Sequence, residues 1–166
     1  MVSGATRGIG RAIAEALLEH GAQVVGVYGG NRGAAEAMAK DCGRFGDRLR
    51  LEFEVAEAAY PGLVPSLILQ PLVENALKYA VAPREGGGRL RIIAQLESGH
   101  LKLVVADDGP GLPVGVELGT GRGVGFRNTR ERLAALYGEH QTLAVRFSRP
   151  GLRIEITLPF ERAVQP

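Results

Sequence analysis

Apolar and polar residues alternate along several short segments between residues 49 and 158. In segment 49–55 the apolar positions are Leu49, Leu51, Phe53 and Val55, with charged residues between them. A period of two places such side chains on one face of a half-buried β-strand. Segments 89–97 and 100–106 flank Ser98-Gly99, and segments 142–147 and 152–158 flank Arg149-Pro150-Gly151. Because both connections are typical hairpin turns, the pattern predicts one strand followed by two hairpins.

Two other segments have the period of an amphipathic helix. Residues 70–80 read QPLVENALKYA, and on a helix their apolar stripe consists of Leu72, Val73, Ala76, Leu77 and Ala80. Taken alone, this is an ordinary surface helix with a Glu74–Lys78 pair four residues apart. A second helix is predicted at about 126–137. The order strand, helix, hairpin, glycine-rich loop, helix, hairpin predicts an α+β sandwich with its helices on one face of a mostly antiparallel sheet.

The first 43 residues have a different organisation. A glycine-rich turn precedes a predicted helix at 9–20, a strand at 23–28 and a second helix at about 33–40. With residues 1–3 as the end of a first strand, this is the βαβα order of a Rossmann-like fragment. We place the domain boundary at residues 42–44. The expected units are therefore an N-terminal fragment at 1–43, a domain at 44–160 and a tail at 161–166.

Composition excludes several classes of function. A formal net charge of +2 over 166 residues is too small to indicate nucleic acid or an anionic membrane as a partner. No apolar run approaches the roughly 20 residues of a membrane-spanning helix, and the N-terminus lacks the order of a signal peptide. Cys42 is the single cysteine, which leaves no internal disulfide. We therefore expect a cytoplasmic protein without a membrane segment.

Two glycine-containing motifs have the chemistry of a nucleotide site. Residues 107–111 read DDGPG directly after a predicted strand, and residues 121–125 read GRGVG before a predicted helix. An aspartate at a strand end, with glycines that allow close backbone approach, can accept a hydrogen bond from an exocyclic amine. Backbone N–H groups at the start of a helix bind phosphate. A neutral asparagine oxygen, such as that of Asn75, suits Mg²⁺ completed by phosphates.

With these motifs in this order, residues 44–160 resemble the ATP-binding domain of sensor histidine kinases. This domain belongs to the gyrase/Hsp90/histidine kinase/MutL superfamily, and the branch that it resembles is the LytS type. The similar segments are RFGDRL at 44–49, LQPLVENA at 69–76 and GFRNTRERL at 125–133. The resemblance implies a two-layer α/β sandwich of the Bergerat type, with ATP and Mg²⁺ as cofactors.

The resemblance also implies roles for individual residues. Asn75 would hold Mg²⁺, Asp107 would read the adenine amino group, and Gly109 and Gly111 would shape the adenine pocket. The residues implied near the phosphates are Gly121, Gly123, Gly125, Lys78 and Arg130. The loop between Gly111 and Gly121 would be a short ATP lid.

One departure bears on the reaction. The hydrolysing branches of the superfamily carry a glutamate one turn before the asparagine, and here that position is Pro71, which cannot act as a base. Glu74 is adjacent to Asn75 and points about 100° away on a helix. Efficient hydrolysis is therefore not expected. Pro71 either costs the helix a backbone bond or marks its first turn.

A histidine kinase also needs an acceptor histidine. The chain has His20, His100 and His140, and none lies in the Pro-His-Phe-like context of the family's acceptor. We expect His100 and His140 to be solvated surface residues and His20 to end a helix, where its charge interacts favourably with the helix dipole. Self-phosphorylation is therefore not expected. A response regulator or a separate phosphoacceptor domain is then the expected partner.

Residues 3–10, SGATRGIG, resemble the cofactor-binding start of short-chain dehydrogenases, so the chain is interpreted as a chimera. The glycines would turn over a pyrophosphate, and Arg32 would favour NADP. The alternative function is therefore an NADP-dependent oxidoreductase. Two observations count against it: the three residues before the turn are too few for a full first strand, and the catalytic Tyr-x-x-x-Lys motif is missing. A third hypothesis is a non-enzymatic nucleotide-binding module in which the N-terminal helices form the interface of a homo-oligomer and any bound nucleotide is only structural.

Overall fold

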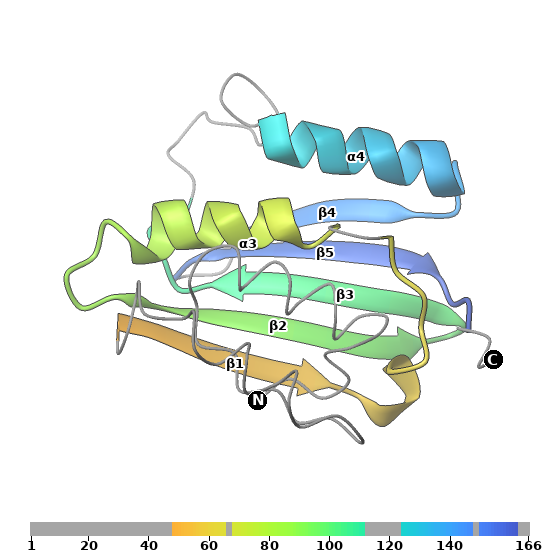
Figure 1. Cartoon of the computed structure of the whole chain (residues 1–166), viewed down its shortest axis with the longest axis horizontal. Coiled ribbons are helices and arrows are strands. Elements are labelled where there is room, and N and C mark those ends of the chain that lie inside the picture. The colour runs from red at the N-terminus through yellow and green to blue at the C-terminus, as the bar shows by residue number, and fades with distance from the viewer. Residues whose placement is uncertain (1–47, 66–67, 112–123, 148–149, 163–166) are drawn as a thin grey trace, which may run out of the picture.

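The computed structural model describes residues 48–65, 68–111, 124–147 and 150–162. They form a five-stranded sheet in the order β1-β2-β3-β5-β4 (Figure 1). The strands are β1 (Leu49–Val55), β2 (Gly88–Glu97), β3 (His100–Asp107), β4 (Thr142–Phe147) and β5 (Leu152–Pro159). β1 pairs with β2 in parallel, and the β2–β3, β3–β5 and β4–β5 pairs are antiparallel. The predicted mostly antiparallel sheet is confirmed.

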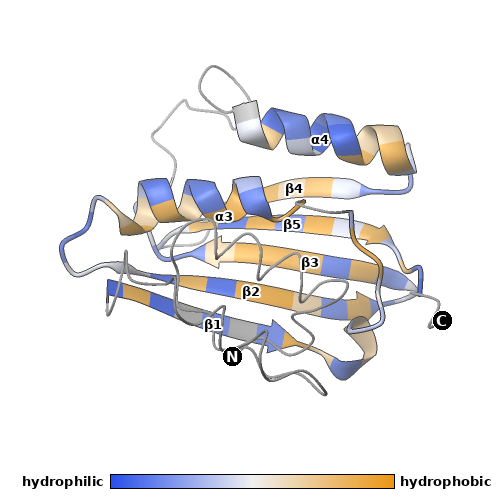
Figure 2. Ribbon diagram, viewed as in Figure 1, coloured by the Kyte–Doolittle hydropathy of each residue, from blue (hydrophilic) through white to orange (hydrophobic). Residues whose placement is uncertain are grey.

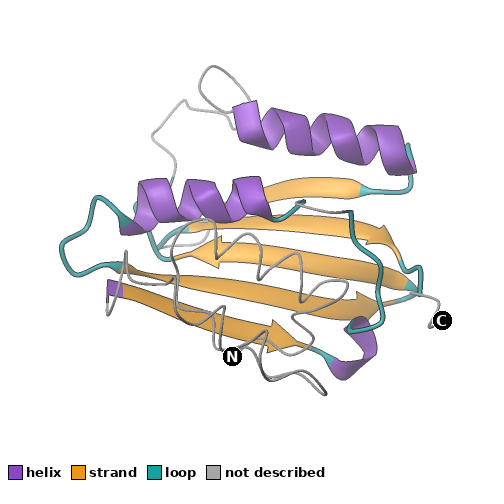
Figure 3. Cartoon of the chain, in the orientation of Figure 1, coloured by secondary structure: helices purple, strands orange, loops and turns teal. Residues whose placement is uncertain are grey.

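Two helices lie together on one side of this sheet, as Figure 3 shows. α3 (Gln70–Ala76) continues directly into η3 (Leu77–Val81), and α4 (Val124–Tyr137) follows the glycine-rich loop. A short 3₁₀ turn, η2 (Glu57–Ala59), connects β1 to the segment before α3. The parallel β1–β2 pair needs a crossover connection, and η2, α3 and η3 supply it.

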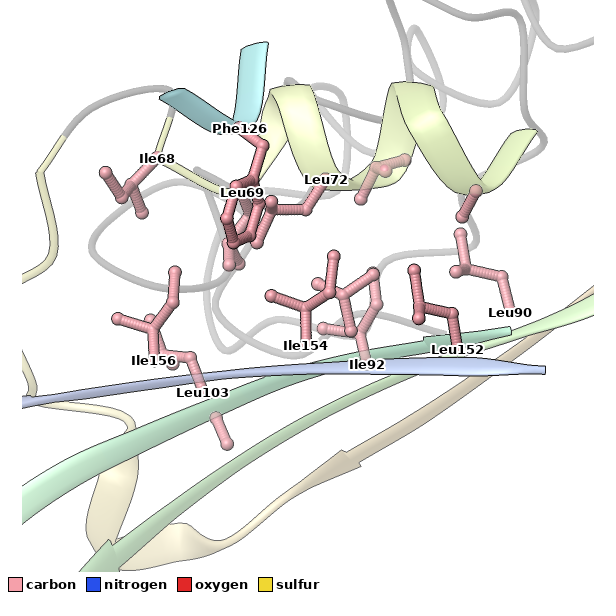
Figure 4. Close-up of a cluster of buried hydrophobic side chains, with 14 of the residues drawn as sticks. Ile68, Leu69, Leu72, Leu90, Ile92, Leu103, Phe126, Leu152, Ile154 and Ile156 are labelled. Carbon is pink, nitrogen blue, oxygen red and sulfur yellow. The ribbon is translucent and has the colours of Figure 1, made fainter. Parts of the chain in front are cut away.

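The core lies between these helices and the sheet (Figure 4). The whole predicted stripe of the first helix is buried: Leu72, Val73, Ala76, Leu77 and Ala80. Phe126 and Leu133 of α4 are fully buried as well, and β5 alternates between buried and half-buried positions along its length. Figure 2 shows the apolar residues of β2, β3 and β5 concentrated in the middle of the sheet. Each fully buried aliphatic or aromatic side chain contributes about 1.5–3 kcal/mol relative to exposure.

The helix predicted at 70–80 differs from the observed one in its last turn. From Leu77 the backbone is π-helical, because the Ala82 N–H donates to the Leu77 carbonyl, five residues earlier, at 2.8 Å. Pro71 lies in the first turn of α3, where a missing N–H costs no helical bond. Of the two interpretations of Pro71, the helix start is therefore confirmed. α4 begins at Val124, two residues before the predicted start.

Candidate functional site

Asp107 ends β3 with its carboxylate fixed by backbone groups. Both the Gly109 N–H, at 2.9 Å, and the Leu152 N–H, at 3.3 Å, donate to Oδ1. These bonds orient the side chain from its own loop and from the start of β5. Because both end on Oδ1, Oδ2 is the oxygen that a ligand can use as an acceptor.

The backbone around Asp107 is packed too closely for larger residues at two glycines. A methyl group on Gly109 would lie 2.4 Å from Ala80 Cβ, on the helix that carries Asn75. Gly151 has φ +106°, and a methyl group there would lie 1.8 Å from the Asp107 carbonyl oxygen. The end of β3, the end of η3 and the turn before β5 therefore meet at one point.

The pKa values of the two adjacent carboxylates, Asp107 and Asp108, are shifted in opposite directions. Burial raises the pKa of Asp107 above its ordinary value, although the N–H groups of Gly109 and Leu152 act in the other direction. Burial also disfavours the charge of Asp108, but the Arg89 N–H and the Arg84 guanidinium outweigh it and lower the pKa of Asp108. Asp107 is thus a desolvated acceptor, whereas Asp108 is held as a partner of positive and N–H groups.

The structure places Asn75 in the last turn of α3, half-buried beside the fully covered stripe. Lys78 is exposed in η3, with its ammonium 5.1 Å from the centre of the Tyr79 ring. Glu74 accepts a hydrogen bond from the Gln70 amide at 3.0 Å. A single neutral amide oxygen fits Mg²⁺ only when phosphates supply further ligands. Among the residues that the structure describes, no group of three or more His, Cys, Asp or Glu could hold a metal ion by itself.

The start of α4 packs against the start of α3. A methyl group on Gly125 would lie 3.1 Å from Pro71 Cβ, and the buried Thr129 hydroxyl donates to the Gly125 carbonyl at 2.9 Å. Arg130 lies over the Phe126 ring, 5.2 Å from its centre. Gly121, Gly123 and the predicted lid lie outside the described residues.

Several contributors to this site were not expected from the sequence. They are the Leu152 N–H, the turn at Gly151, the ion pair between Arg84 and Asp108, and the Thr129 hydroxyl. Gly151 is visible in the sequence as a hairpin residue, but its contact with Asp107 depends on the pairing of β3 with β5.

The histidines that the structure describes are surface residues, as expected. His100 is exposed at the start of β3, with Nδ1 3.1 Å from the Ser98 carbonyl oxygen, and His140 is exposed after α4. His20, Cys42 and the dehydrogenase-like motif lie in residues 1–43, outside the described residues, and the interpretations attached to them stay predictions. Among the described helices, none has the length and apolar character needed to cross a membrane.

Comparison with known families defines the class of this fold. Residues 64–162, more than half of the chain, match the family described as "Histidine kinase-, DNA gyrase B-, and HSP90-like ATPase". The chain therefore belongs to this family, and its α+β sandwich is the Bergerat fold expected from the resemblance.

Individual relatives narrow the class. The chain is 37% identical over 123 residues to the sensor histidine kinase YesM of Bacillus subtilis, covering 73% of this chain and 21% of the relative. It is 29% identical over 126 residues to the sensor protein LytS of Staphylococcus saprophyticus, covering 70% and 21%. It also has the fold of the Erythrobacter litoralis EL346 blue-light activated histidine kinase, with a TM-score of 0.56, 22% identity and coverage of 68% and 36%.

These matches identify an ATP-binding domain of sensor-histidine-kinase type, similar to those of YesM and LytS. The chain spans about a fifth of the length of both curated relatives.

Proposed function

We propose that this domain binds ATP with Mg²⁺ and supplies the γ-phosphoryl group to a histidine outside residues 48–162. The observation that carries the proposal is the Asp107 carboxylate, which two backbone N–H groups fix through Oδ1 at a strand end. Gly109 brings this strand end against Ala80 of the helix that also carries Asn75. Adenine and metal recognition would then use neighbouring elements.

In this proposal each group has one task. Asp107 accepts a hydrogen bond from the adenine amino group through Oδ2, beside Gly109 and Gly111. Asn75 holds Mg²⁺, which when bound neutralises charge on the phosphates. Lys78 and Arg130 are proposed to contact the phosphates, with the Arg130 guanidinium lying over the Phe126 ring. Gly125, near the start of α4, would offer its N–H group to a phosphate. Gly121 and Gly123 lie outside the described residues, and their contact with the phosphates stays a proposal.

The same site is poorly equipped for hydrolysis. Pro71 occupies the position one turn before Asn75 and packs against Gly125, so it supplies no base to activate water. ATP is then retained for transfer to a protein group. This favours a kinase over a rapid ATPase.

The acceptor is proposed to be a separate phosphoacceptor segment, followed by a response regulator, in the cytoplasm where ATP is available. His100 and Asp107 are the first and last residues of β3. Six residues lie between them, and seven steps along the strand separate their Cα atoms by roughly 23 Å, which places His100 at the far end of the strand from the proposed adenine site.

Calorimetry of the full chain with Mg-ATP tests this proposal. Asp107→Asn keeps an oxygen for the two N–H groups but removes the charged acceptor, so we expect ATP affinity to fall about 10- to 100-fold. Glu155→Gln is the matched control, because Glu155 is a carboxylate on β5 that pairs with Arg153 instead. Absence of ATP binding by the unchanged chain, or equal losses in both variants, would overturn the proposal.

A further inference from the structure

We propose that Arg84 is a positioning residue for adenine recognition, and that Arg48 holds Arg84 in place. The inference rests on the proposed role of Asp107 and deepens it. Arg84 lies in the loop at 82–87 between η3 and β2, and Arg48 lies directly before β1. Arg84 lies in none of the segments that carry the family resemblance, whereas Arg48 lies in the RFGDRL segment at 44–49.

Arg84 donates hydrogen bonds to two oxygens of Asp108, the residue that follows Asp107. Its Nη1 donates to Asp108 Oδ1 at 2.7 Å and to the Asp108 carbonyl oxygen at 3.1 Å. The Arg89 N–H donates to the same Oδ1 at 2.8 Å, and the Asp108 N–H donates to the Arg89 carbonyl at 3.2 Å. The main chain and side chain of Asp108 are therefore both fixed from the loop at 82–87 and from β2.

These hydrogen bonds to Asp108 affect Asp107 because Asp108 lies between Asp107 and Gly109. The Gly109 N–H is the shorter of the two hydrogen bonds that orient the Asp107 carboxylate, at 2.9 Å against 3.3 Å. A rotation of the Asp108 peptide would turn this N–H away from Oδ1. On the helix side, contact with Ala80 already limits such a movement. Arg84 limits it on the solvent side.

Arg48 fixes the loop that carries Arg84. Its Nη2 donates to the Arg84 carbonyl at 2.6 Å and to the Ala82 carbonyl at 3.4 Å. Gly87 also packs on the main chain of Arg48, since a methyl group on Gly87 would lie 1.7 Å from the Arg48 carbonyl oxygen. A continuous set of contacts therefore runs from the residue before β1, through Arg84 and Asp108, to the adenine-binding carboxylate.

Because the Arg84–Asp108 ion pair is partly exposed, its effect on ligand geometry can be distinguished from its effect on stability. The Arg84 and Asp108 side chains are 43% and 32% exposed, and exposed pairs of this kind contribute little to stability. Loss of Arg84 should therefore alter ligand geometry more than thermal unfolding. The charge of Arg84 also opposes the effects of burial and of Asp108, which raise the pKa of Asp107. Without Arg84, Asp107 should become protonated at a higher pH, so the pH below which ATP binding is lost should also be higher.

The test compares ATP with ITP on the full chain by calorimetry. Inosine has a carbonyl oxygen in place of the adenine amino group, so it gains nothing from a well-placed Asp107. In Arg84→Gln we expect ATP affinity to fall about 3- to 10-fold with ITP affinity unchanged, which narrows the discrimination between them. Arg48→Gln should give a smaller change in the same direction. Arg91→Gln is the matched control, because Arg91 is equally exposed on β2 and pairs with Glu52 and Glu54.

Each outcome decides between the two proposals. If Asp107→Asn abolishes the preference for ATP but Arg84→Gln leaves it intact, the positioning role is wrong and the proposed function stands. Equal losses for ATP and ITP in Arg84→Gln also overturn the positioning role, because they indicate a general structural defect. If Asp107→Asn itself has no effect, the proposed function fails. Arg84→Lys and Arg48→Gln decide the question if Arg84→Gln does not fold, with Arg84→Lys expected to restore the pH limit but only part of the discrimination.

Discussion

The β2–β3 hairpin has two ends that use similar residues for different purposes. At the closed end, Ser98 and Gly99 have φ of 49° and 78° and form a two-residue turn between the paired residues Glu97 and His100. A methyl group on Gly99 would meet nothing within 4 Å. At the open end, Asp107 is surrounded by backbone from three elements, and a methyl group on Gly151 would overlap its carbonyl.

The difference shows how the requirement for glycine arises. At the closed end glycine serves only the local twist of a hairpin. At the open end it serves contacts between segments distant in sequence, because Gly151 and Asp107 meet only when β5 pairs with β3. The closed end should therefore tolerate changes that the open end does not.

The largest expected effect is that of an alanine at the open end. Gly151→Ala combines positive φ with a clash against backbone, and we expect the free energy of unfolding to fall by about 3 kcal/mol or more. Gly99→Ala is the matched change at the closed end, where only the positive φ is unfavourable, at about 1–2 kcal/mol. Urea unfolding followed by circular dichroism measures both. Equal losses would remove the distinction between the two ends.

A smaller effect should separate the two carboxylates at the open end. Asp108→Asn removes an exposed ion pair, so at pH 7 we expect a loss of unfolding free energy of up to about 1 kcal/mol. Asp107→Asn should leave stability unchanged or raise it, because the ionised side chain is unfavourably buried. Urea unfolding of both variants and of the unchanged chain at pH 7 is the measurement.

The dependence of the unfolding free energy on pH should distinguish the contributions of Asp107 and Asp108. The pKa of Asp108 is lowered by folding, so its contribution is present above the ordinary value of 3.8 and is lost as pH falls through the lowered pKa. The pKa of Asp107 is raised, so its favourable contribution exists below 3.8 and is lost as pH rises through the raised pKa. Acidification toward pH 3 should therefore bring both variants closer to the unchanged chain. A divergence on acidification would contradict this assignment.

The smallest expected effect is a gain at the closed end. Ser98 is the non-glycine residue with positive φ among those the structure describes, and asparagine adopts this conformation more readily in such a turn. Ser98→Asn should raise the free energy of unfolding by about 0.5 kcal/mol, with ATP affinity unchanged. Thermal unfolding and calorimetry check the two statements. A change in ATP affinity would show that the two ends communicate.

Much of the fold could be predicted because its patterns are local. The alternation in 49–55 and the turn at Ser98-Gly99 give strands whose ends agree with the structure to within about a residue. The burial of all five stripe residues follows from the helical period. The strand order was not predicted, because the pairing of β3 with β5 depends on packing between distant segments. The π-helical end of the first helix was not predicted either, because the spacing of its apolar residues does not distinguish a π-helix from an α-helix.

The candidate site divides in the same way. Asn75 and Asp107 could be proposed from their chemistry and their neighbouring glycines. Arg84 could not, because it lies 24 residues from Asp108 and 36 residues from Arg48, and only folding brings the three together. An arginine in a polar loop has many other uses. Its role depends on geometry that no local pattern contains.

The π-helical turn gives the helix of Asn75 a tolerance for evolutionary insertions and deletions. In an α-helix one added residue rotates every later side chain by about 100°. The wider turn at Leu77–Val81 accommodates an additional residue while Ala80 and Val81 stay buried against the sheet. A residue added in this turn is then absorbed within it, so the side chains from Ala80 onward keep their position relative to Asn75 and to the part of the apolar stripe before the turn. Homologues whose segment between this asparagine and the next strand differs by one residue should therefore keep the same arrangement of α3.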